Sequence, residues 1–355
     1  MNFSSIPFFN TAVAVIITWA LFAILCSLVH EAIAQVLAER GRFMKNYLFK
    51  QLKDQTNGFN WASLLYMNGS VSMLTRDPAK PTNDISPKRF AESIVDATGK
   101  IQAVKAIAPA TKFYTNPLLN NLKAALSILN PSDVTLLLND CLASAEAKAS
   151  SQAGVLNETE VYNNLIQNIE NWYFDFTGRL TLWYKKRTRK RLFLLGLLVA
   201  VIINLDSIKV FSFYRDNPVA ATTVMDYYQK NKTSLEAMAA KADTMKVIVI
   251  SGKDSALQML PAKEYLKNLK LTEPADSFLK ELQALQAKTS LPVGTDHSIL
   301  LELKIEKETK EKEKKEWSYG SFWFWKILGL IITGFAASFG GPFWFDVLRK
   351  VYTKS

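Results

Sequence analysis

The chain has 355 residues, of which 49% are hydrophobic and 21% are charged, and its formal net charge is +11. This composition excludes a collagen, a disulfide scaffold and an intrinsically disordered chain, and the length suits two or three ordinary domains. The basic excess indicates an anionic partner, either nucleic acid or a membrane surface, and the position of the charges along the chain decides between them.

The first apolar segment, Ala12–Val29, contains no charged residue and is close to the roughly 20 apolar residues that a membrane-spanning helix needs. Residues 1–11 contain neither Lys nor Arg, and no small-residue cleavage site precedes a polar segment, so the pattern favours a retained anchor over a cleaved signal peptide. The helix is expected to continue through the polar residues His30 and Glu31. We predict an N-terminal transmembrane helix within residues 1–39.

Residues 40–190 are predicted to form a helical domain. A proline follows a capping Ser or Asn at Ser86-Pro87 and at Asn116-Pro117, which is typical of a helix start. Asn157, with a Glu three residues later, resembles a capping box. No proline occurs from Leu156 to Asn217, so one helix could run from this domain into the second apolar segment. Such a helix suits an anchor or a transmitter of motion, and equally a simple chain connection.

The second apolar segment, Leu192–Leu205, is shorter than the first. It can cross a bilayer if a flanking basic side chain reaches the interface and the helix continues, and the alternative is a buried helix of a soluble domain. We predict a transmembrane helix over residues 191–213. Asn204 and Asp206 lie near its outer end, where Asp206 could instead cap the following helical turn.

Residues 214–320 are predicted to form a small α+β domain outside the cytoplasm. Ala220–Ala242 and Ala262–Lys288 are helix candidates, while Lys246–Ser251 and Ser298–Ile305 are strand-like runs that could pair. Neither of the chain's two cysteines lies in this domain, so we expect no structural disulfide there. This cysteine usage suits a bacterial inner membrane better than a eukaryotic secretory route.

The third apolar segment, Phe322–Phe345, predicts a transmembrane helix over residues 321–348, followed by a basic tail at 349–355. The sequence Gly340-Gly341-Pro342 is expected to break or kink this helix near its inner end. Aromatic residues at both ends are typical of the two membrane–water interfaces. The residues that we assign to these interfaces are Trp323, Trp325, Phe343, Trp344 and Phe345.

Small residues recur every fourth position in the same segment, at Gly329, Thr333, Ala337 and Gly341. Such a stripe lets another helix approach closely. Packing within the same chain explains it, and self-association of two chains is the alternative.

Basic residues collect at one end of each apolar segment, which predicts that all three ends face the cytoplasm. Residues 40–190 and the C-terminus would then be inside, and the N-terminus and 214–320 outside. We expect the clustered charges to contact anionic lipid headgroups and not nucleic acid. The residues of this set are Arg40, Arg42, Lys185, Lys186, Arg187, Arg189, Lys190, Arg191, Arg349 and Lys350.

No motif predicts catalysis, a cofactor or a metal site. The chain has only two histidines and no Cys/His cluster, and it lacks a phosphate-binding loop, a dinucleotide fingerprint and a nucleophile elbow. The candidate polar sites at the membrane are His30, Glu31, Asn204 and Asp206. They suit structural or interfacial roles, contact with a partner, or the handling of an ion or proton.

Four segments follow one another in a recognisable order: Phe176-Thr-Gly-Arg-Leu-Thr-Leu-Trp-Tyr-Lys-Lys-Arg-Thr188, Asn204-Leu-Asp-Ser-Ile208, Ser290-Leu-Pro-Val-Gly294 and Ser338-Phe-Gly-Gly-Pro-Phe-Trp-Phe-Asp-Val-Leu348. In this order they resemble a group of uncharacterised bacterial integral membrane proteins with a C-terminal Gly-Pro-Phe-Trp-Phe-Asp segment. The resemblance covers most of the chain, from Glu31 to the tail, although Gly294 is followed by Thr295 where a tryptophan is expected. It implies the topology and fold, and it implies no activity or catalytic residue.

The sequence thus predicts a mainly α membrane protein with three transmembrane helices, a helical cytoplasmic domain and a small α+β extracytoplasmic domain. We expect a multi-pass protein of the bacterial inner membrane that acts as a non-enzymatic anchor or scaffold for a partner protein assembly, or that forms a homo-oligomer. The alternative is an oligomeric channel or transport component that uses the polar residues near the span ends.

Overall fold

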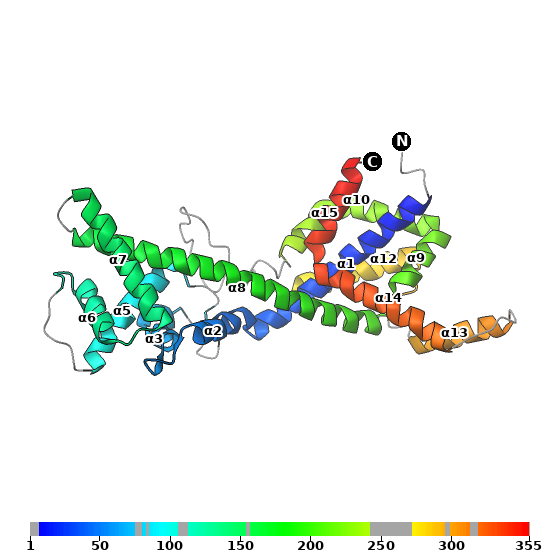
Figure 1. The fold of residues 1–355 in the computed structure, drawn as a ribbon. Coiled ribbons are helices and arrows are strands. Elements are labelled where there is room, and N and C mark those ends of the chain that lie inside the picture. The colour runs from blue at the N-terminus through cyan, green and yellow to red at the C-terminus, as the bar shows by residue number, and fades with distance from the viewer. Residues whose placement is uncertain are drawn as a thin grey trace. The chain divides into compact units, whose positions relative to one another are not determined.

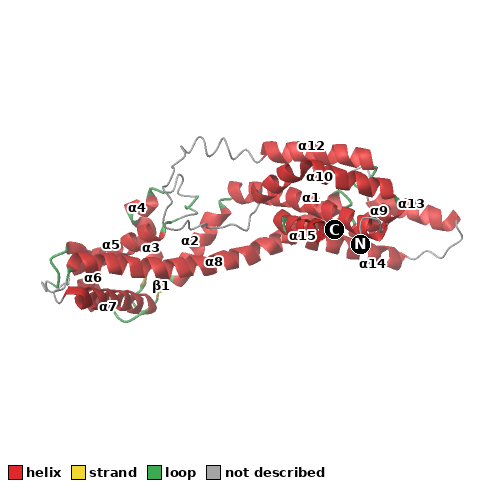
Figure 2. Ribbon diagram, turned by 90° about the horizontal axis from the view of Figure 1, so that it is seen from above, coloured by secondary structure: helices red, strands yellow, loops and turns green. Residues whose placement is uncertain are grey.

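A computed structural model describes residues 7–74, 80–82, 85–105, 113–153, 157–241, 272–294, 299–312 and 319–354. The described chain is mainly helical, as predicted (Figures 1 and 2). It divides into two compact units. Of the described residues, unit 1 comprises those within 1–34, 185–241 and 272–354, and unit 2 comprises those within 35–184.

Unit 2 is a bundle of helices that contains one small antiparallel hairpin, with Lys53 paired to Asn60 and Asp54 to Phe59. The predicted helix starts at Pro87 and Pro117 are confirmed, and the Asn116 side chain caps the second by accepting from the Leu118 N–H at 3.0 Å. The elements are α2 (Glu39–Gln51), β1 (Lys53–Asp54), β2 (Phe59–Asn60), α3 (Trp61–Met67), α4 (Gly69–Ser72), α5 (Pro87–Lys105), α6 (Pro117–Ile128) and α7 (Asp133–Ala153), with the first part of α8 (Glu158–Ile202).

Asp54 ties the hairpin of unit 2 to the helices around it. Its buried carboxylate accepts hydrogen bonds from the Trp61 indole at 3.0 Å, the Ser132 hydroxyl at 2.7 Å and the backbone and side chain of Asn57. Burial raises the pKa of Asp54, but these hydrogen bonds outweigh it and hold the pKa below its usual value. The carboxylate is therefore a fixed part of the unit 2 core.

Helix α8 contributes to both units. It runs without interruption from Glu158 to Ile202, and Asn157 caps its start by accepting from the Thr159 N–H at 3.1 Å. The first part carries buried Tyr173 and Phe176 of the unit 2 core, and the last part carries buried Leu192 and Ala200 of the unit 1 core. The continuous helix expected from the proline-free sequence is confirmed as far as Ile202, where it breaks.

Unit 1 surrounds helix α1 with shorter helices. Every side chain of α1 from Ala20 to Leu28 is buried, so its middle is enclosed by protein on all sides. Helix α10 packs against α9, α12 and α15, and α14 packs against α9 and α15 (Figure 1). The elements are α1 (Pro7–Val36), the end of α8, α9 (Ser207–Asp216), α10 (Pro218–Lys241), α12 (Thr272–Thr289), α13 (Ile299–Lys312), α14 (Tyr319–Phe339) and α15 (Gly341–Lys354).

Among the described residues, two helices are long and apolar enough to cross a membrane: α1, over Phe8–Val36, and α14. A third candidate exists if α8 and α9, which are bent by 56° relative to one another, form one broken span. Residues 191–213 are therefore not a single straight helix, because the chain leaves the helical path between Ile202 and Ser207.

The third predicted span is shorter than expected. Helix α14 ends at Phe339, and Gly340 adopts a φ of 78°, which a glycine accommodates without a steric penalty. The predicted break at Gly340-Gly341-Pro342 is thus confirmed. We expected residues 341–348 to complete the span, but they begin a separate helix, α15.

The strand predicted at Ser298–Ile305 is wrong, because residues 299–305 begin helix α13. Its expected partner, Lys246–Ser251, lies outside the described residues. Within the described part of the chain, the strands β1 and β2 belong to the segment that we expected in the cytoplasm. The Lys/Glu-rich sequence from Glu302 onward favours helix instead, because it places opposite charges four residues apart.

Candidate functional site at a broken helix

The break between α8 and α9 has a defined geometry. The Leu205 N–H donates to the Ala200 carbonyl at 2.9 Å, and the Asn204 N–H donates to the Val201 carbonyl at 3.4 Å. Asn204 between them adopts a left-handed φ of 53°. This is the Schellman end of a helix, with Asn at the position that otherwise favours glycine. The break is therefore encoded locally by Asn204.

Asp206 starts the next helix. Its Oδ1 accepts from the backbone N–H of Ile208 at 2.9 Å and of Lys209 at 3.3 Å, which is the N-cap role considered for it from the sequence. Its other oxygen, Oδ2, lies 3.3 Å from the Nζ of Lys326 on α14. The side chain of Lys326 is only 1% exposed and that of Asp206 only 3%, so this ion pair is buried.

Glu302 of α13 completes a cluster of charges around Lys326. Its Oε2 lies 2.8 Å from the Lys326 Nζ and accepts from the Asn204 amide at 2.7 Å, while its Oε1 pairs with Lys209. Burial raises the pKa of Glu302, but hydrogen bonds from Lys209, Lys326 and Asn204 outweigh it and hold the pKa below its ordinary value. Two carboxylates thus face two ammonium groups.

Gly329 makes room for this cluster. A Cβ at Gly329 would lie 1.8 Å from the Asp206 Oδ1, so a larger residue would displace the carboxylate. One turn further along α14, the Thr333 hydroxyl lies 2.7 Å from the Ser207 hydroxyl, which also accepts from the Trp19 indole at 3.0 Å. Helices α1, α9 and α14 therefore meet at Ser207.

The segment after α12 also reaches the break. The Gly294 N–H donates to the Ile203 carbonyl at 2.7 Å, which satisfies one of the carbonyls left free at the end of α8. Gly294 has a φ of 125°, a backbone conformation that residues other than glycine rarely adopt. The break thus draws residues from α8, α9, α13, α14 and the loop at 290–294 into one place.

Chemically, the cluster is a charge-balanced clamp. Each carboxylate has cationic and hydrogen-bond partners, and the described residues contain no group of His, Cys, Asp and Glu that could hold a metal ion. Buried charges persist in proteins when they are paired in this way, and removing one partner leaves an uncompensated charge. The arrangement therefore suits fixing the angle between α8 and α9 and docking α13 and α14 against them.

The structure brings together two of the four polar residues predicted at the membrane. Asn204 and Asp206 belong to the clamp, whereas His30 and Glu31 are buried near the end of α1. On α1, Trp19 lies beside the clamp because its indole donates to Ser207. His30 lies 11 residues further along the same helix, at a distance of about 16 Å, and is therefore remote from the clamp.

Sequence reasoning missed Lys326 and Glu302. Lys326 was visible as a charged residue in an otherwise apolar segment, which is itself a signal for a paired partner. Glu302 offered no signal, because it is one of many alternating charges in its segment. Only the tertiary fold brings it to Lys326.

The small-residue stripe contacts other segments of the same chain. Gly329 faces Asp206, and Thr333 bonds Ser207. Ala337 faces Gly196 of α8, where an added Cβ would lie 2.4 Å from its own. Gly341 begins α15, and a Cβ there would lie 3.0 Å from side-chain atoms of Ile24 and Ala239.

The predicted interface aromatics have different environments. Trp323, Trp325 and Phe343 are partly exposed, whereas Trp344 and Phe345 are buried in the core of unit 1. The Trp344 ring lies 5.0 Å from Trp19, and its indole donates to the Ala336 carbonyl at 2.7 Å. Because α15 turns away from α14, these two residues contact protein where we expected them to contact headgroups.

The basic residues predicted to contact lipid are mostly at the surface. On α8, the exposed members are Lys186, Arg187, Arg189 and Lys190, with Lys185 and Arg191 partly covered; Arg42 on α2 and Lys350 on α15 are exposed and Arg40 is half-buried. Arg349 lies 3.7 Å from Glu236 of α10 and 3.5 Å from Asp346.

The contact between Arg349 and Glu236 differs from the expected topology. The sequence placed these two residues on opposite sides of a membrane, and the structure places them side by side. The reason is the break at Gly340, after which α15 packs against α10.

Searches against protein-family models, curated proteins and solved structures give no match to this chain. The fold alone defines it as a mainly helical protein whose described residues include two helices, or three with the broken α8–α9 pair, that are apolar enough to span a membrane.

Proposed function

We propose that this protein is a non-enzymatic membrane anchor that holds its helical unit 2 at the bilayer surface for a partner protein assembly. The observation that carries the proposal is α8, one continuous helix of 45 residues. Its first part belongs to the core of helical unit 2, and its last part carries an apolar outer face. Such a helix joins a soluble module to a membrane segment without a linker.

The outer face of α8 suits lipid. Leu194, Leu198, Val201 and Ile202 are exposed in the chain by 43% or more and recur at helical spacing. Phe335 of α14 is also exposed and packs beside this face, with its ring 4.9 Å from that of Phe193. Monomeric soluble proteins rarely expose a large contiguous apolar surface.

The positions of the basic residues support the same placement. The run of Lys and Arg at 185–191 lies directly before the apolar face of α8, where attraction to anionic headgroups contributes about 1 kcal/mol per residue. We propose the bacterial inner membrane, with the N-terminus outside and unit 2 in the cytoplasm. The basic α15 then lies at the cytoplasmic interface, and α10 extends from the outer side toward it.

Helix α1 contributes little to the contact with lipid, although it is apolar enough to span a membrane. Because its middle is enclosed by protein, the lipid contact falls mainly to α8 and α14. In this proposal, unit 2 corresponds to the helical cytoplasmic domain predicted from the sequence. The parts of unit 1 that flank the break between α8 and α9 correspond to the predicted extracytoplasmic domain.

Unit 2 offers an apolar strip for the partner. Phe174 is 51% exposed and Leu182 is 65% exposed, and the two lie eight residues apart on the same face of α8, with Gly178 between them. Exposed apolar residues in a row on one helix are typical of a helix-binding surface. A second copy of the chain or a different protein would cover this strip.

The mass of the purified protein tests the proposal. In mild detergent, we expect the wild-type chain to elute as a complex larger than one 40.0 kDa chain, either with a partner protein or as an oligomer. Leu182→Glu should release the complex, because a charge on the strip opposes its burial. The matched control is Leu136→Glu, a change at a leucine on α7 that is also more than half exposed (51%) and that should leave the complex intact. A monodisperse single chain without a co-purifying protein would contradict the scaffold.

The channel alternative finds less support. Asn204 and Asp206, which the sequence offered as pore-lining groups, hold internal contacts of the clamp. A group that pairs with a buried Lys has little freedom to pass ions.

A further inference from the structure

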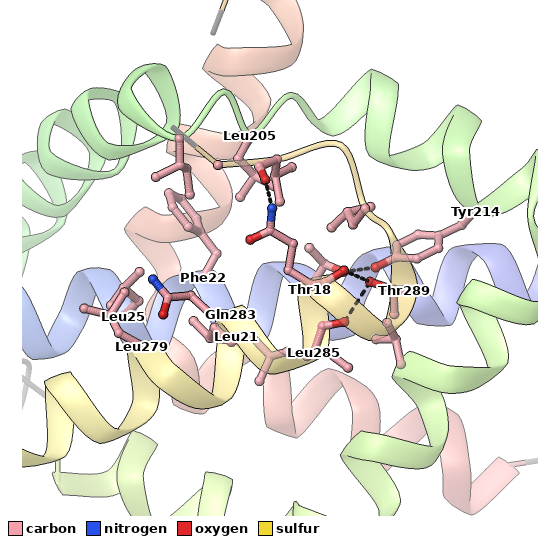
Figure 3. A pocket seen from close by; sticks show the side chains of 17 residues that line it. Thr18, Leu21, Phe22, Leu25, Leu205, Tyr214, Leu279, Gln283, Leu285 and Thr289 are labelled. Atoms are coloured by element: carbon pink, nitrogen blue, oxygen red, sulfur yellow. Dashed lines mark hydrogen bonds between the residues drawn. The ribbon is translucent and has the colours of Figure 1, made fainter. Parts of the chain in front are cut away.

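A second feature of unit 1 is a cavity of about 500 Å³ between α1, α9, α10 and α12. Leu21 and Leu25 of α1 and Leu279 and Leu285 of α12 are among the side chains that line it (Figure 3). This volume lies within the range of small-molecule sites, which are mostly apolar with a few polar groups. The cavity thus has the size and chemistry of a ligand site.

The polar groups of the cavity are uncharged side chains of Thr, Tyr and Gln. The Thr18 hydroxyl lies 2.9 Å from the Tyr214 hydroxyl, and the Thr289 hydroxyl donates to the Leu285 carbonyl at 2.9 Å (Figure 3). Figure 3 shows Gln283 near Leu25, away from these hydroxyls. None of the residues that line the cavity is charged. Burying an unpaired charge is costly, so the part of a ligand that enters must be neutral and mostly hydrocarbon.

The rim of the cavity suits a ligand with a polar head. Leu279 lines the cavity yet is 39% exposed, and Gln283, one turn further along α12, is also exposed. The Gln283 amide can donate to an ester or carboxylate oxygen while hydrocarbon fills the interior. The other wall belongs to α1, whose apolar side chains Leu21, Phe22 and Leu25 give a hydrocarbon chain a surface to pack against.

We propose that this cavity binds one long acyl chain, with its head at Gln283 and its hydrocarbon between α1 and α12. Two sources supply this chemistry: a membrane phospholipid, of which one chain enters, and a free fatty acid. The proposal is independent of the anchor function, because it concerns the interior of unit 1 and not the outer face of α8.

The test uses the full chain transferred from detergent into an amphipathic polymer, with a long-chain polyene fatty acid whose fluorescence rises in apolar surroundings. We expect saturable binding to the wild-type protein. Leu279→Trp should weaken it by about tenfold or more, because the indole occupies the mouth of the cavity. The matched control is Ala284→Trp, on the exposed opposite face of the same helix, which should bind as the wild type does.

A second variant and a lipid extraction complete the test. Leu282→Trp fills the interior and should also abolish binding, and thermal unfolding of each variant checks that it is folded. In organic extracts, a species present in wild type and depleted in Leu279→Trp identifies the source as a fatty acid or a phospholipid. The proposal is overturned if the wild type shows no saturable binding, or if folded Leu279→Trp binds as well as Ala284→Trp.

Discussion

Replacing Lys326 with methionine is expected to lower the free energy of unfolding of unit 1 by about 3–5 kcal/mol. Methionine fits the space of the aliphatic stem but removes the ammonium group between Asp206 and Glu302. Asp206 then keeps its helix-capping hydrogen bonds but remains buried without a cation. The measurement is thermal or denaturant unfolding of the purified variant in mild detergent, compared with the wild type.

Lys209→Met is the matched control for this prediction. Lys209 pairs with the same Glu302 but is 42% exposed, so its loss should cost less than about 1 kcal/mol. The double variant Lys326→Met with Asp206→Asn should recover part of the loss, because the amide still caps α9 and leaves no unpaired charge. Equal destabilisation by Lys326→Met and Lys209→Met would contradict the clamp.

Gly329→Ala is expected to destabilise unit 1 by about 1–3 kcal/mol, the usual cost of overpacking a core. The new methyl group would lie 1.8 Å from the Asp206 Oδ1, a contact that requires Asp206 to move away from Lys326. On helix propensity alone the change should stabilise the protein, so the sign of the effect reports on the packing. Unfolding in mild detergent measures it.

Two other glycines provide controls. Gly334→Ala lies on the same helix, and its Cβ would meet the Phe193 ring at 3.2 Å, a side chain that can shift, so we expect a smaller effect. Gly178→Ala on α8 meets nothing within 4 Å and should stabilise the protein by about 0.5–1 kcal/mol. If Gly329→Ala stabilised the protein as Gly178→Ala does, Asp206 would not occupy the position described.

The local signals for where helices begin and end were reliable, whereas the strand pattern at Ser298–Ile305 was not. Pro87 and Pro117 begin helices, Gly340 ends one, and Asp206 caps α9, because each depends on the backbone chemistry of one or two residues. Asn204 marks the break in the same way, although its meaning was clear only from the φ of 53°.

The tertiary partners could not be predicted from the sequence. The pairing of Lys326 with Asp206 and Glu302 joins residues far apart in the chain, and nothing in the local sequence specifies such a pairing. Helix α1 illustrates a second limit. A helix that is apolar on all sides fits lipid and a protein interior equally well, so its enclosure within unit 1 was not visible in its composition.

The break at Gly340 had the largest consequence for topology. The sequence predicted a break there but not its direction, which depends on where α15 finds an apolar surface to cover. That surface is formed by Trp19, Ile24 and Tyr228, and it draws Trp344 and Phe345 inward. The aromatic pattern typical of a membrane interface is thus in part the buried face of α15.

The most direct test of the membrane-anchor proposal is cysteine accessibility in intact cells. The native Cys26 and Cys141 are both buried, and replacing them with alanine removes any residual background. Ser150→Cys then probes unit 2 and Thr222→Cys probes the start of α10, both at exposed positions. A membrane-impermeant maleimide should label Thr222→Cys in intact cells and label Ser150→Cys only after lysis. Labelling of Ser150→Cys in intact cells, or recovery of the chain in the soluble fraction, would contradict a membrane protein with unit 2 in the cytoplasm.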